Sequence, residues 1–251
     1  YRISKFVVDW MRERGDMRLP KLAEMMIKLD GKNADPTDLA NYKGVIPNPG
    51  ATGDINNTDM EDGSQSRLKS KWYLEPVGPS AMNIGYPEQE FILAEAALRG
   101  WTEDDPETHY LNGIRAAHEF LGVSSADTRA YLGHEKVQFK GSDTEKLGKI
   151  ITEKYLNFFM QGGNEAYFEL RRTGYPDFSA YLTHNTDQIY NDGYLPLRYR
   201  YPQSEIDNNN AQVSEAIKRL DKGDDRNSRM WLLQGSDPLF NPAPFPFRYK
   251  N

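Results

Sequence analysis

The chain has 251 residues, of which 38% are hydrophobic, and its formal net charge is −6 at pH 7. These values are typical of a soluble globular protein, and no stretch approaches the ~20 consecutive apolar residues that a membrane-spanning helix needs. The mildly acidic balance gives no electrostatic support to binding of nucleic acid or of an anionic membrane. The absence of cysteine excludes disulfides, thiolate catalysis and cysteine metal sites.

The first 30 residues predict two helices separated by the segment RGDMRLP. The apolar residues at helical spacing are Ile3, Phe6, Val7, Trp10 and Met11 in the first helix and Leu22, Met25, Met26 and Leu29 in the second. Pro20 suits the first turn of the second helix. Because the chain starts at Tyr1 directly within a helical pattern, we expect it to be the C-terminal portion of a longer protein. A processed mature chain is the alternative.

Residues 31–70 contain many Gly, Asn, Asp, Pro and Ser residues and show no helical or strand periodicity. A segment of this length without periodicity in a compact domain is either functional or disordered. The part from Asp54 to Asp62 is rich in carboxylates and amides but lacks the order D-x-[DN]-x-[DN]-G of a calcium-binding loop. A solvated loop is therefore the preferred interpretation of that part.

A short apolar island, Lys71–Leu74, follows the long segment. Its aromatic pair, Trp72 and Tyr73, could supply a surface on which a sugar or a peptide stacks. Alternatively, Trp72 holds the loop against the helical core, since tryptophan is often mostly buried with one exposed edge. The sequence leaves both interpretations open.

Residues 86–121 predict a pair of helices. Pro87 opens the first helix and Gly100 closes it. The second helix begins at about Asp105. The residues of its apolar face are Tyr110, Ile114, Ala117 and Leu121. Small alanine residues let such helices approach closely, so we expect 87–100 to pack against 105–121 as an antiparallel hairpin of the tetratricopeptide type.

A further helix pair is predicted between Ser142 and Pro176. Ser142 is a potential N-cap of the first helix. The apolar face of that helix consists of Leu147, Ile150, Ile151, Tyr155, Phe158 and Phe159. We expect Gly162 and Gly163 to end it, because glycine readily adopts the left-handed cap conformation. We expect Asn164 to cap the next helix through its side-chain oxygen.

Other segments carry weaker signals. Tyr131–Phe139 is expected to be extended or irregular. After Pro176 the chain is rich in turn residues, apart from one predicted helix. That helix carries Val213, Ala216, Ile217 and Leu220. The C-terminal tail places aromatic residues among prolines and cannot be helical throughout.

Motifs of the common catalytic sites are absent. The four histidines form no metal signature, since His134-Glu135 lacks the second histidine of H-E-x-x-H, and neither G-x-S-x-G nor a P-loop occurs. Paired acids such as Glu88 and Glu90 suit a helix N-terminus, where the dipole favours negative charge. A glycosidase needs two carboxylates that face each other across a sugar, which spacing cannot show. We therefore name no catalytic residue, no metal ligand and no cofactor.

Three stretches carry a resemblance to a known family. They are EAYFELRRTGYP at 165–176, EFILAEAALRGW at 90–101 followed by YLNGIRAA at 110–117, and PLRYRYPQSE at 196–205. Asp16–Pro20 is similar to a D-P-R-L turn in which Met17 replaces proline, and Tyr167 stands where tryptophan is expected. In this order, the stretches resemble the SusD/RagB-like family of outer-membrane nutrient-binding lipoproteins, in the branch with RRTGYP.

The resemblance implies a mostly α fold, with tetratricopeptide-like helical hairpins and long irregular loops, in which residues 1–251 form the C-terminal portion of a single SusD-like domain. It implies capture of an oligosaccharide at the cell surface and delivery to a partner TonB-dependent, SusC-like transporter, without catalysis or cofactor. Location at the outer membrane would depend on an N-terminal lipid upstream of this chain. A peptide-binding lipoprotein of the same type, a glycoside hydrolase and a helical-repeat interaction scaffold stay open.

The resemblance also implies structural roles for its motif residues, which are Glu165, Arg171, Arg172, Gly174, Pro176, Arg198 and Pro202. We expect Arg171 and Arg172 to pair with carboxylates or helix-end carbonyls.

Binding of a neutral sugar needs flat apolar faces beside amide or carboxylate groups, because each desolvated hydroxyl left unpaired costs about 1–3 kcal/mol. The long segment and its exit combine such groups. The candidate ligand-binding residues are Asn41, Tyr42, Trp72, Tyr73 and Asn83. Trp72 and Tyr42 are the predicted stacking rings.

Overall fold

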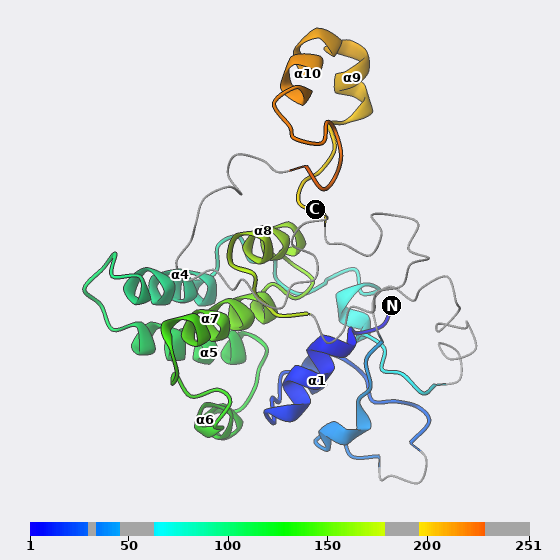
Figure 1. Ribbon diagram of the computed structural model, residues 1–251. Helices are drawn as coiled ribbons and strands as arrows, with labels where there is room; N and C mark the ends of the chain where they lie inside the picture. The colour runs from blue at the N-terminus through cyan, green and yellow to red at the C-terminus, as the bar shows by residue number, and fades with distance from the viewer. Residues whose placement is uncertain (30–33, 46–62, 179–195, 229–251) are drawn as a thin grey trace. The chain divides into compact units, whose positions relative to one another are not determined.

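The computed structural model describes residues 1–29, 34–45, 63–178 and 196–228 (Figure 1). The α-helices of these parts are α1 (Lys5–Glu13), α2 (Leu19–Leu22), α4 (Tyr86–Leu98), α5 (Pro106–Phe120), α6 (Ser125–Gly133), α7 (Asp143–Asn157), α8 (Gly163–Thr173), α9 (Gln203–Asn208) and α10 (Asn210–Ile217). Two 3₁₀ helices, η1 (Leu39–Asn41) and η2 (Ser70–Trp72), lie between α2 and α4. Backbone pairing of the strand type is limited, in the described parts, to isolated bridges. The predicted mostly α fold is confirmed.

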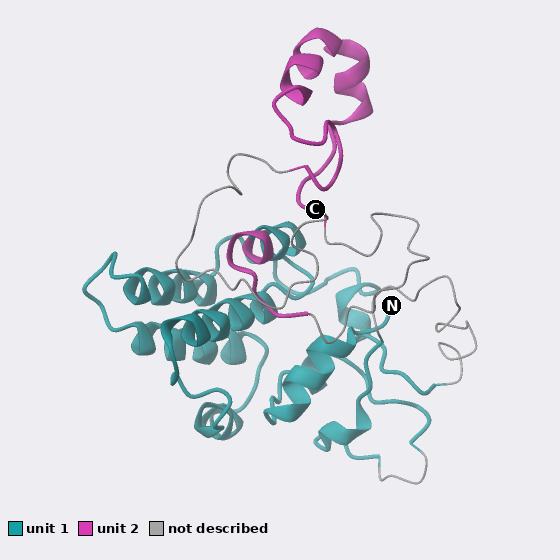
Figure 2. Ribbon diagram, in the orientation of Figure 1, with its two compact units in different colours: residues 1–49, 53–168 teal, residues 50–52, 169–251 magenta. Residues whose placement is uncertain are grey.

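The chain divides into two compact units, which Figure 2 shows in different colours. Unit 1 consists of residues 1–49 and 53–168, and unit 2 consists of residues 50–52 and 169–251. Unit 1 contains every helix from α1 to α7 and the first residues of α8. That the whole chain forms a single domain stays a prediction.

The centre of unit 1 is the helical hairpin of α4 and α5, against which α7 packs (Figure 1). The buried residues of this core are Phe91, Ala94, Tyr110, Ile114, Tyr131, Val137, Phe139 and Ile150. Gly113 allows a close approach of the two helices, since a Cβ at that position would lie 2.6 Å from Phe91 Cε1. The predicted antiparallel hairpin is confirmed, and glycine as well as alanine makes it possible.

The start of α7 follows the prediction. Ser142 Oγ accepts a hydrogen bond from the backbone N–H of Glu145, and the Glu145 carboxylate accepts one from the backbone N–H of Ser142. This reciprocal capping box satisfies two N–H groups that the helix itself leaves unpaired. The predicted N-cap is therefore confirmed.

The predicted end of α7 is wrong. The helix ends at Asn157, and the residue in left-handed conformation is Met160, with a φ of 60°. Gly163 is the first residue of α8, and Asn164 lies inside that helix. Gly162 is instead needed for close packing, since a Cβ there would lie 2.7 Å from Phe158 Cδ1.

The second predicted helix is also much shorter than expected. α2 ends at Leu22, so the apolar stripe that continues to Leu29 is not helical. Ala23 is extended and forms an antiparallel bridge with Leu68, and the Met26 N–H donates to the Asn41 carbonyl. Pairing with the long loop segment thus overrides the local helical pattern.

The prediction that residues 131–139 are extended or irregular holds for residues 134–139, which form turns and bends, but is wrong for Tyr131, which lies in the last turn of α6. The side chain of Ser124 caps this helix by accepting from the Asp127 N–H. Only Thr128 and Tyr131 are buried in α6, so its sequence carries little periodicity. Val137, which follows in a turn, is also buried in the core of unit 1.

Candidate ligand-binding site

A buried ionic cluster joins the turn between α1 and α2 to later helices. Arg18 is 1% exposed, and Asp16 is fully buried. Arg18 Nε donates to both carboxylate oxygens of Asp16, at 3.1 and 2.9 Å, and Arg18 Nη2 donates to Asp16 Oδ2 at 2.6 Å. Nη2 also donates to Glu153 Oε2 at 2.8 Å and faces the Tyr131 hydroxyl at 3.3 Å. Charge-assisted hydrogen bonds of this kind are stronger than neutral ones.

His118, on α5, lies within this cluster without adding charge to it. Its Nε2 is 3.5 Å from Asp16 Oδ1, and its Nδ1 is 3.2 Å from Thr128 Oγ1. Burial, together with the positive charge of Arg18, lowers the pKa of His118 to about 3, so the imidazole is neutral at pH 7. Burial, together with the charge of Glu153, raises the pKa of Tyr131 well above its usual value. Tyr131 therefore stays protonated and donates to Glu153.

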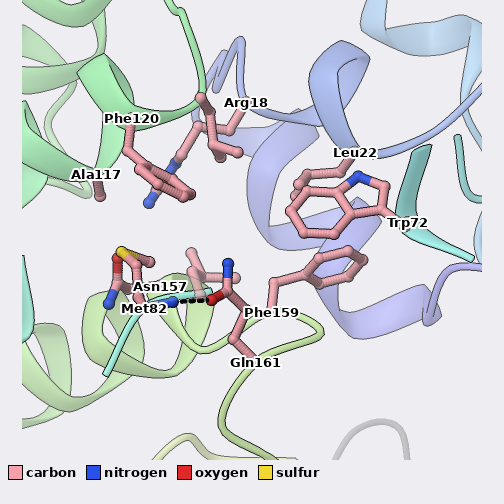
Figure 3. Close-up of a pocket in the computed structure, with 11 residues that line it drawn as sticks. Arg18, Leu22, Trp72, Met82, Ala117, Phe120, Asn157, Phe159 and Gln161 are labelled. Carbon is pink, nitrogen blue, oxygen red and sulfur yellow. Dashed lines mark hydrogen bonds between the residues drawn. The ribbon is translucent and has the colours of Figure 1, made fainter. Parts of the chain in front are cut away.

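A small, partly open pocket lies beside Arg18 in unit 1 (Figure 3). Its lining residues are Arg18, Leu22, Trp72, Met82, Ala117, Phe120, Leu121, Leu156, Asn157, Phe159 and Gln161. In Figure 3 the Phe120 ring lies across the pocket from Trp72 and Phe159. The pocket therefore presents aromatic rings on two sides.

Polar groups complete the wall between these rings. Gln161 Oε1 accepts from the Met82 N–H at 2.6 Å, which fixes the amide, and Figure 3 shows the amide nitrogen turned toward the middle of the pocket. Within the described residues neither this nitrogen nor the Asn157 amide has a hydrogen-bond partner. Arg18 Nη1 is buried and unpartnered as well. The pocket thus offers amide groups next to apolar faces.

The contacts of Trp72 fit both roles that the sequence leaves open, the loop anchor and the stacking surface. Its ring packs edge-to-face on Phe159, with 5.7 Å between the ring centroids and an interplanar angle of 83°, and this contact holds η2 against the segment after α7. The same ring lines the pocket. Lys71 Nζ lies 5.3 Å from the Trp72 centroid, so the ring also carries a cation–π contact.

The other predicted ligand residues do not gather at this pocket. Tyr42 is 1% exposed and its hydroxyl donates to the Pro36 carbonyl at 3.0 Å, while Asn41 is fully buried. These contacts favour a structural role, because a buried ring presents no face to a ligand. Tyr73 packs against Tyr1 at 4.8 Å. Asn83 is exposed and follows the pocket residue Met82 in sequence.

The sequence did not indicate the polar residues of the pocket or of the buried ionic cluster beside it. Asp16 and Arg18 belong to the segment RGDMRLP between the two predicted helices, and only the tertiary packing buries them. Asn157 and Gln161 flank the aromatic run at the end of α7. Amide residues interspersed with aromatics at a helix end are the one local signal that could have indicated a binding wall.

The motif residues of α8 make contacts that suit structural roles. Arg171 Nη1 donates to the Leu197 carbonyl at 2.6 Å, and Arg172 pairs with Glu169 on the same helix. Gly174 has a φ of 80°, a left-handed conformation that glycine adopts without steric cost. The structural assignment of these residues stays a prediction.

The remaining motif residues are distributed over both units. In unit 2, Arg198 is buried and donates to Asp224 Oδ1 at 2.6 Å, and Pro202 is the N-cap residue of α9. Pro176, also in unit 2, is buried and follows a cis peptide bond. Glu165, in unit 1, lies exposed in the first turn of α8.

The described residues contain no group of three or more His, Asp or Glu side chains arranged to hold a metal ion. None of their helices is long and apolar enough to cross a bilayer. The candidate calcium segment Asp54–Asp62 lies outside the described residues.

Comparison with solved structures shows the same fold in longer proteins. A SusD homologue from Bacteroides fragilis is 32% identical, with a TM-score of 0.82 over 93% of this chain and 52% of that chain. A second SusD homologue from the same species is 30% identical, with a TM-score of 0.76 over 92% and 51%. A chitin-binding protein is 25% identical, with a TM-score of 0.71 over 93% and 50%. The chain thus spans about half the length of these proteins.

The sequence comparisons agree with the structural ones. No curated protein sequence matches the chain. Residues 1–202 match the SusD-like family described as starch-binding and associating with the outer membrane. This match covers most of the chain, including the helical hairpin, the buried cluster and all residues of the pocket. The chain belongs to the SusD-like family.

Proposed function

We propose that this chain forms part of a cell-surface protein that binds an oligosaccharide and passes it to a partner TonB-dependent transporter of the SusC-like type. The observation that carries the proposal is the match of residues 1–202 to a starch-binding, outer-membrane-associated family. A similar structure is that of a chitin-binding protein, which supports a glycan as the ligand class. Because the chain spans about half of its relatives, the activity is proposed for the whole protein.

The chemistry of the pocket supports a glycan as ligand. Sugars present apolar C–H faces that stack on aromatic rings and hydroxyls that need hydrogen-bond partners. Trp72 supplies a ring beside the amides of Gln161 and Asn157, all of which line one pocket. We assign Trp72 as the stacking residue, with Asn83 near the pocket wall at Met82. Tyr73 is a candidate for contacts outside the pocket.

We further propose that the protein acts by binding alone, without a cofactor, and is held at the cell surface by a lipid on the N-terminal part of the whole protein. The carboxylates of the buried cluster do not support hydrolysis of a glycoside. Asp16 and Glu153 are both bonded to Arg18, whereas a glycosidase needs carboxylates on either side of a sugar.

The test is isothermal titration of the full-length protein with maltohexaose and chitohexaose, alongside an assay with chromogenic glycosides. Measurable affinity without release of the chromophore supports a glycan-binding protein. Release of the chromophore would indicate a hydrolase. Binding of peptides in place of both sugars would move the ligand class to peptide, and binding of a protein partner alone would indicate a scaffold.

A further inference from the structure

We propose that residues 76–84 form a strap that closes the pocket beside Trp72, and that a sugar enters the pocket only after the strap moves away. The latch of the strap is the hydrogen bond that the Met82 N–H donates to Gln161 Oε1 at 2.6 Å, which Figure 3 shows as a dashed line. The inference rests on the proposed glycan binding and adds to it the step that opens the site.

The first argument is the size of the closed pocket. Its free volume is about 10 Å³, which is room for about one water molecule and for no sugar ring. Trp72 and the amides of Asn157 and Gln161 line this space, so the groups that suit a sugar are gathered there but closed off from one. Met82 is the strap residue that lines the same space. Displacement of the strap therefore removes one wall of the pocket.

The second argument is the weak attachment of the strap. Within the described part of the chain, the latch is the only hydrogen bond that residues 76–84 make. Seven of these nine residues are exposed, and the apolar side chains of Val77 and Ile84 are 87% and 78% exposed. Few buried contacts and few hydrogen bonds are the features of segments that open locally at a small cost in free energy. The strap is such a segment.

The third argument is the backbone strain on both sides of the latch. Ile84 and Met160 have φ angles of 49° and 60°, and they are the described residues other than glycine with positive φ. Ile84 lies two positions after Met82, and Met160 lies directly before Gln161. The left-handed conformation is unfavourable for any residue with a Cβ, and most of all for a β-branched one. Strain of this kind gathers at ligand clamps and switch segments, and its release at Ile84 favours opening of the strap.

Opening is coupled to binding through the acceptor of the latch. When the Met82 N–H leaves, Gln161 Oε1 becomes free to accept a hydrogen bond from a sugar hydroxyl beside the Trp72 ring. The ligand thus replaces the strap at the same oxygen, so the acceptor is not left unpaired. The apparent affinity then depends on the fraction of molecules in which the strap is open.

Hydrogen exchange of the full-length protein, followed by mass spectrometry of proteolytic fragments that contain Met82, tests the latch. Gln161→Met keeps the length of the side chain but removes the acceptor, and should speed exchange of these fragments about fivefold in the absence of sugar. Gln89→Met changes an exposed glutamine of α4 outside the pocket and should exchange as the unmodified protein does. Fragments from α5 report whether each variant is folded. Addition of maltohexaose or chitohexaose, whichever binds better, should speed exchange at Met82 in the unmodified protein.

Isothermal titration with the same two sugars tests the coupling to binding. Ile84→Gly removes the strain of the closed strap, and should weaken binding of the better sugar about tenfold because fewer molecules are open. Val77→Gly adds the same backbone freedom to the strap, at a residue whose φ is not positive, and should bind at least as tightly as the unmodified protein.

The outcomes separate the two proposals. Failure of the unmodified protein to bind either sugar would overturn glycan binding, and the role of the strap with it. Equal affinities of Ile84→Gly and Val77→Gly for a sugar that the unmodified protein binds would overturn the strap and leave glycan binding intact. Unchanged exchange in Gln161→Met would do the same. Slower exchange at Met82 when the sugar is added would also contradict displacement of the strap, since the sugar would then bind with the strap closed.

Discussion

Arg18 and Glu153 are 135 positions apart in the sequence, yet Arg18 Nη2 donates to Glu153 Oε2 at 2.8 Å in the interior of unit 1. Both side chains are 1% exposed. The bond connects the turn before α2 to the middle of α7, and Asp16 and Tyr131 add further hydrogen bonds to it. The position of the turn, and of the pocket wall that Arg18 forms, therefore depends on a charge network rather than on apolar packing alone.

Removal of one member of this network should be strongly destabilising. Glu153→Ala should lower the free energy of unfolding by about 3–5 kcal/mol, because it leaves part of the Arg18 charge buried and unpaired. Urea denaturation measures the change. Glu13→Ala removes the exposed partner of Lys136, also in unit 1, and should change stability by less than about 1 kcal/mol. Equal effects of the two variants would show that the buried network does not stabilise unit 1.

The stability of the protein should decrease as the pH is lowered from about 6.5 toward 3, the range set by His118. The pKa of His118 is about 3 in the folded protein, against an ordinary value near 6.5. The unfolded chain therefore binds a proton below pH 6.5 that the folded chain does not accept until about pH 3, so acidification through this range favours unfolding. Urea midpoints at pH 7.5, 6 and 5 should decrease in that order.

The control for this pH dependence is His118→Asn, which removes the titrating group. Its urea midpoint should change less between pH 7.5 and 5 than that of the unmodified protein. An identical pH dependence in the two proteins would show that His118 is not the group responsible.

Gly113 should be intolerant of even one methyl group. Gly113→Ala places a Cβ 2.6 Å from Phe91 Cε1 and should cost about 1–3 kcal/mol of stability, since overpacking forces α4 and α5 apart. Thermal unfolding followed by circular dichroism measures the loss. Gly133→Ala is the matched change, because no atom lies within 4 Å of a Cβ there. A melting temperature of Gly113→Ala at or above that of Gly133→Ala would contradict the close approach.

In unit 2, Arg198 should hold the segments around residues 197 and 224 together. Its guanidinium pairs with Asp224 at 2.6 Å, and both side chains are at most 10% exposed. Arg198→Ala should therefore accelerate hydrogen exchange of the Tyr201 amide, which donates to Asp224. Arg200→Ala, which removes a side chain 60% exposed, should have a much smaller effect. Unchanged exchange in Arg198→Ala would show that the ion pair does not order this segment.

Elements whose causes are local could be predicted from the sequence. The α4–α5 hairpin has Pro87 at its start and a glycine at the end of its first helix, and α7 has a capping box at Ser142. Such features depend on neighbouring residues, so their structural consequences can be read before the tertiary fold is known. The family motifs likewise allowed the mostly α fold class to be predicted from the sequence.

Elements that depend on distant partners could not be predicted. Helical spacing continues through Met25 and Met26, but the bridge of Ala23 with Leu68 ends α2 early. The burial of Arg18 depends on Glu153 and His118, which lie more than 90 positions further along the chain. Tyr42 lies in a segment whose composition predicts an exposed loop, yet its ring is buried within that segment. The candidate site joins segments from α2 to the residues after α7, so only Trp72 among its members was identified from the sequence.

The measurement that tests the central claim most directly is the affinity of the full-length Trp72→Ala variant for the oligosaccharide that the unmodified protein binds, determined by isothermal titration. Trp101→Ala is the control, since Trp101 is 71% exposed on the turn after α4 and lines no part of the pocket. Loss of the Trp72 ring should weaken binding at least about tenfold, while Trp101→Ala should leave it unchanged. Unchanged affinity in a folded Trp72→Ala variant would contradict the site, and would leave Trp72 as the residue that anchors η2 to Phe159.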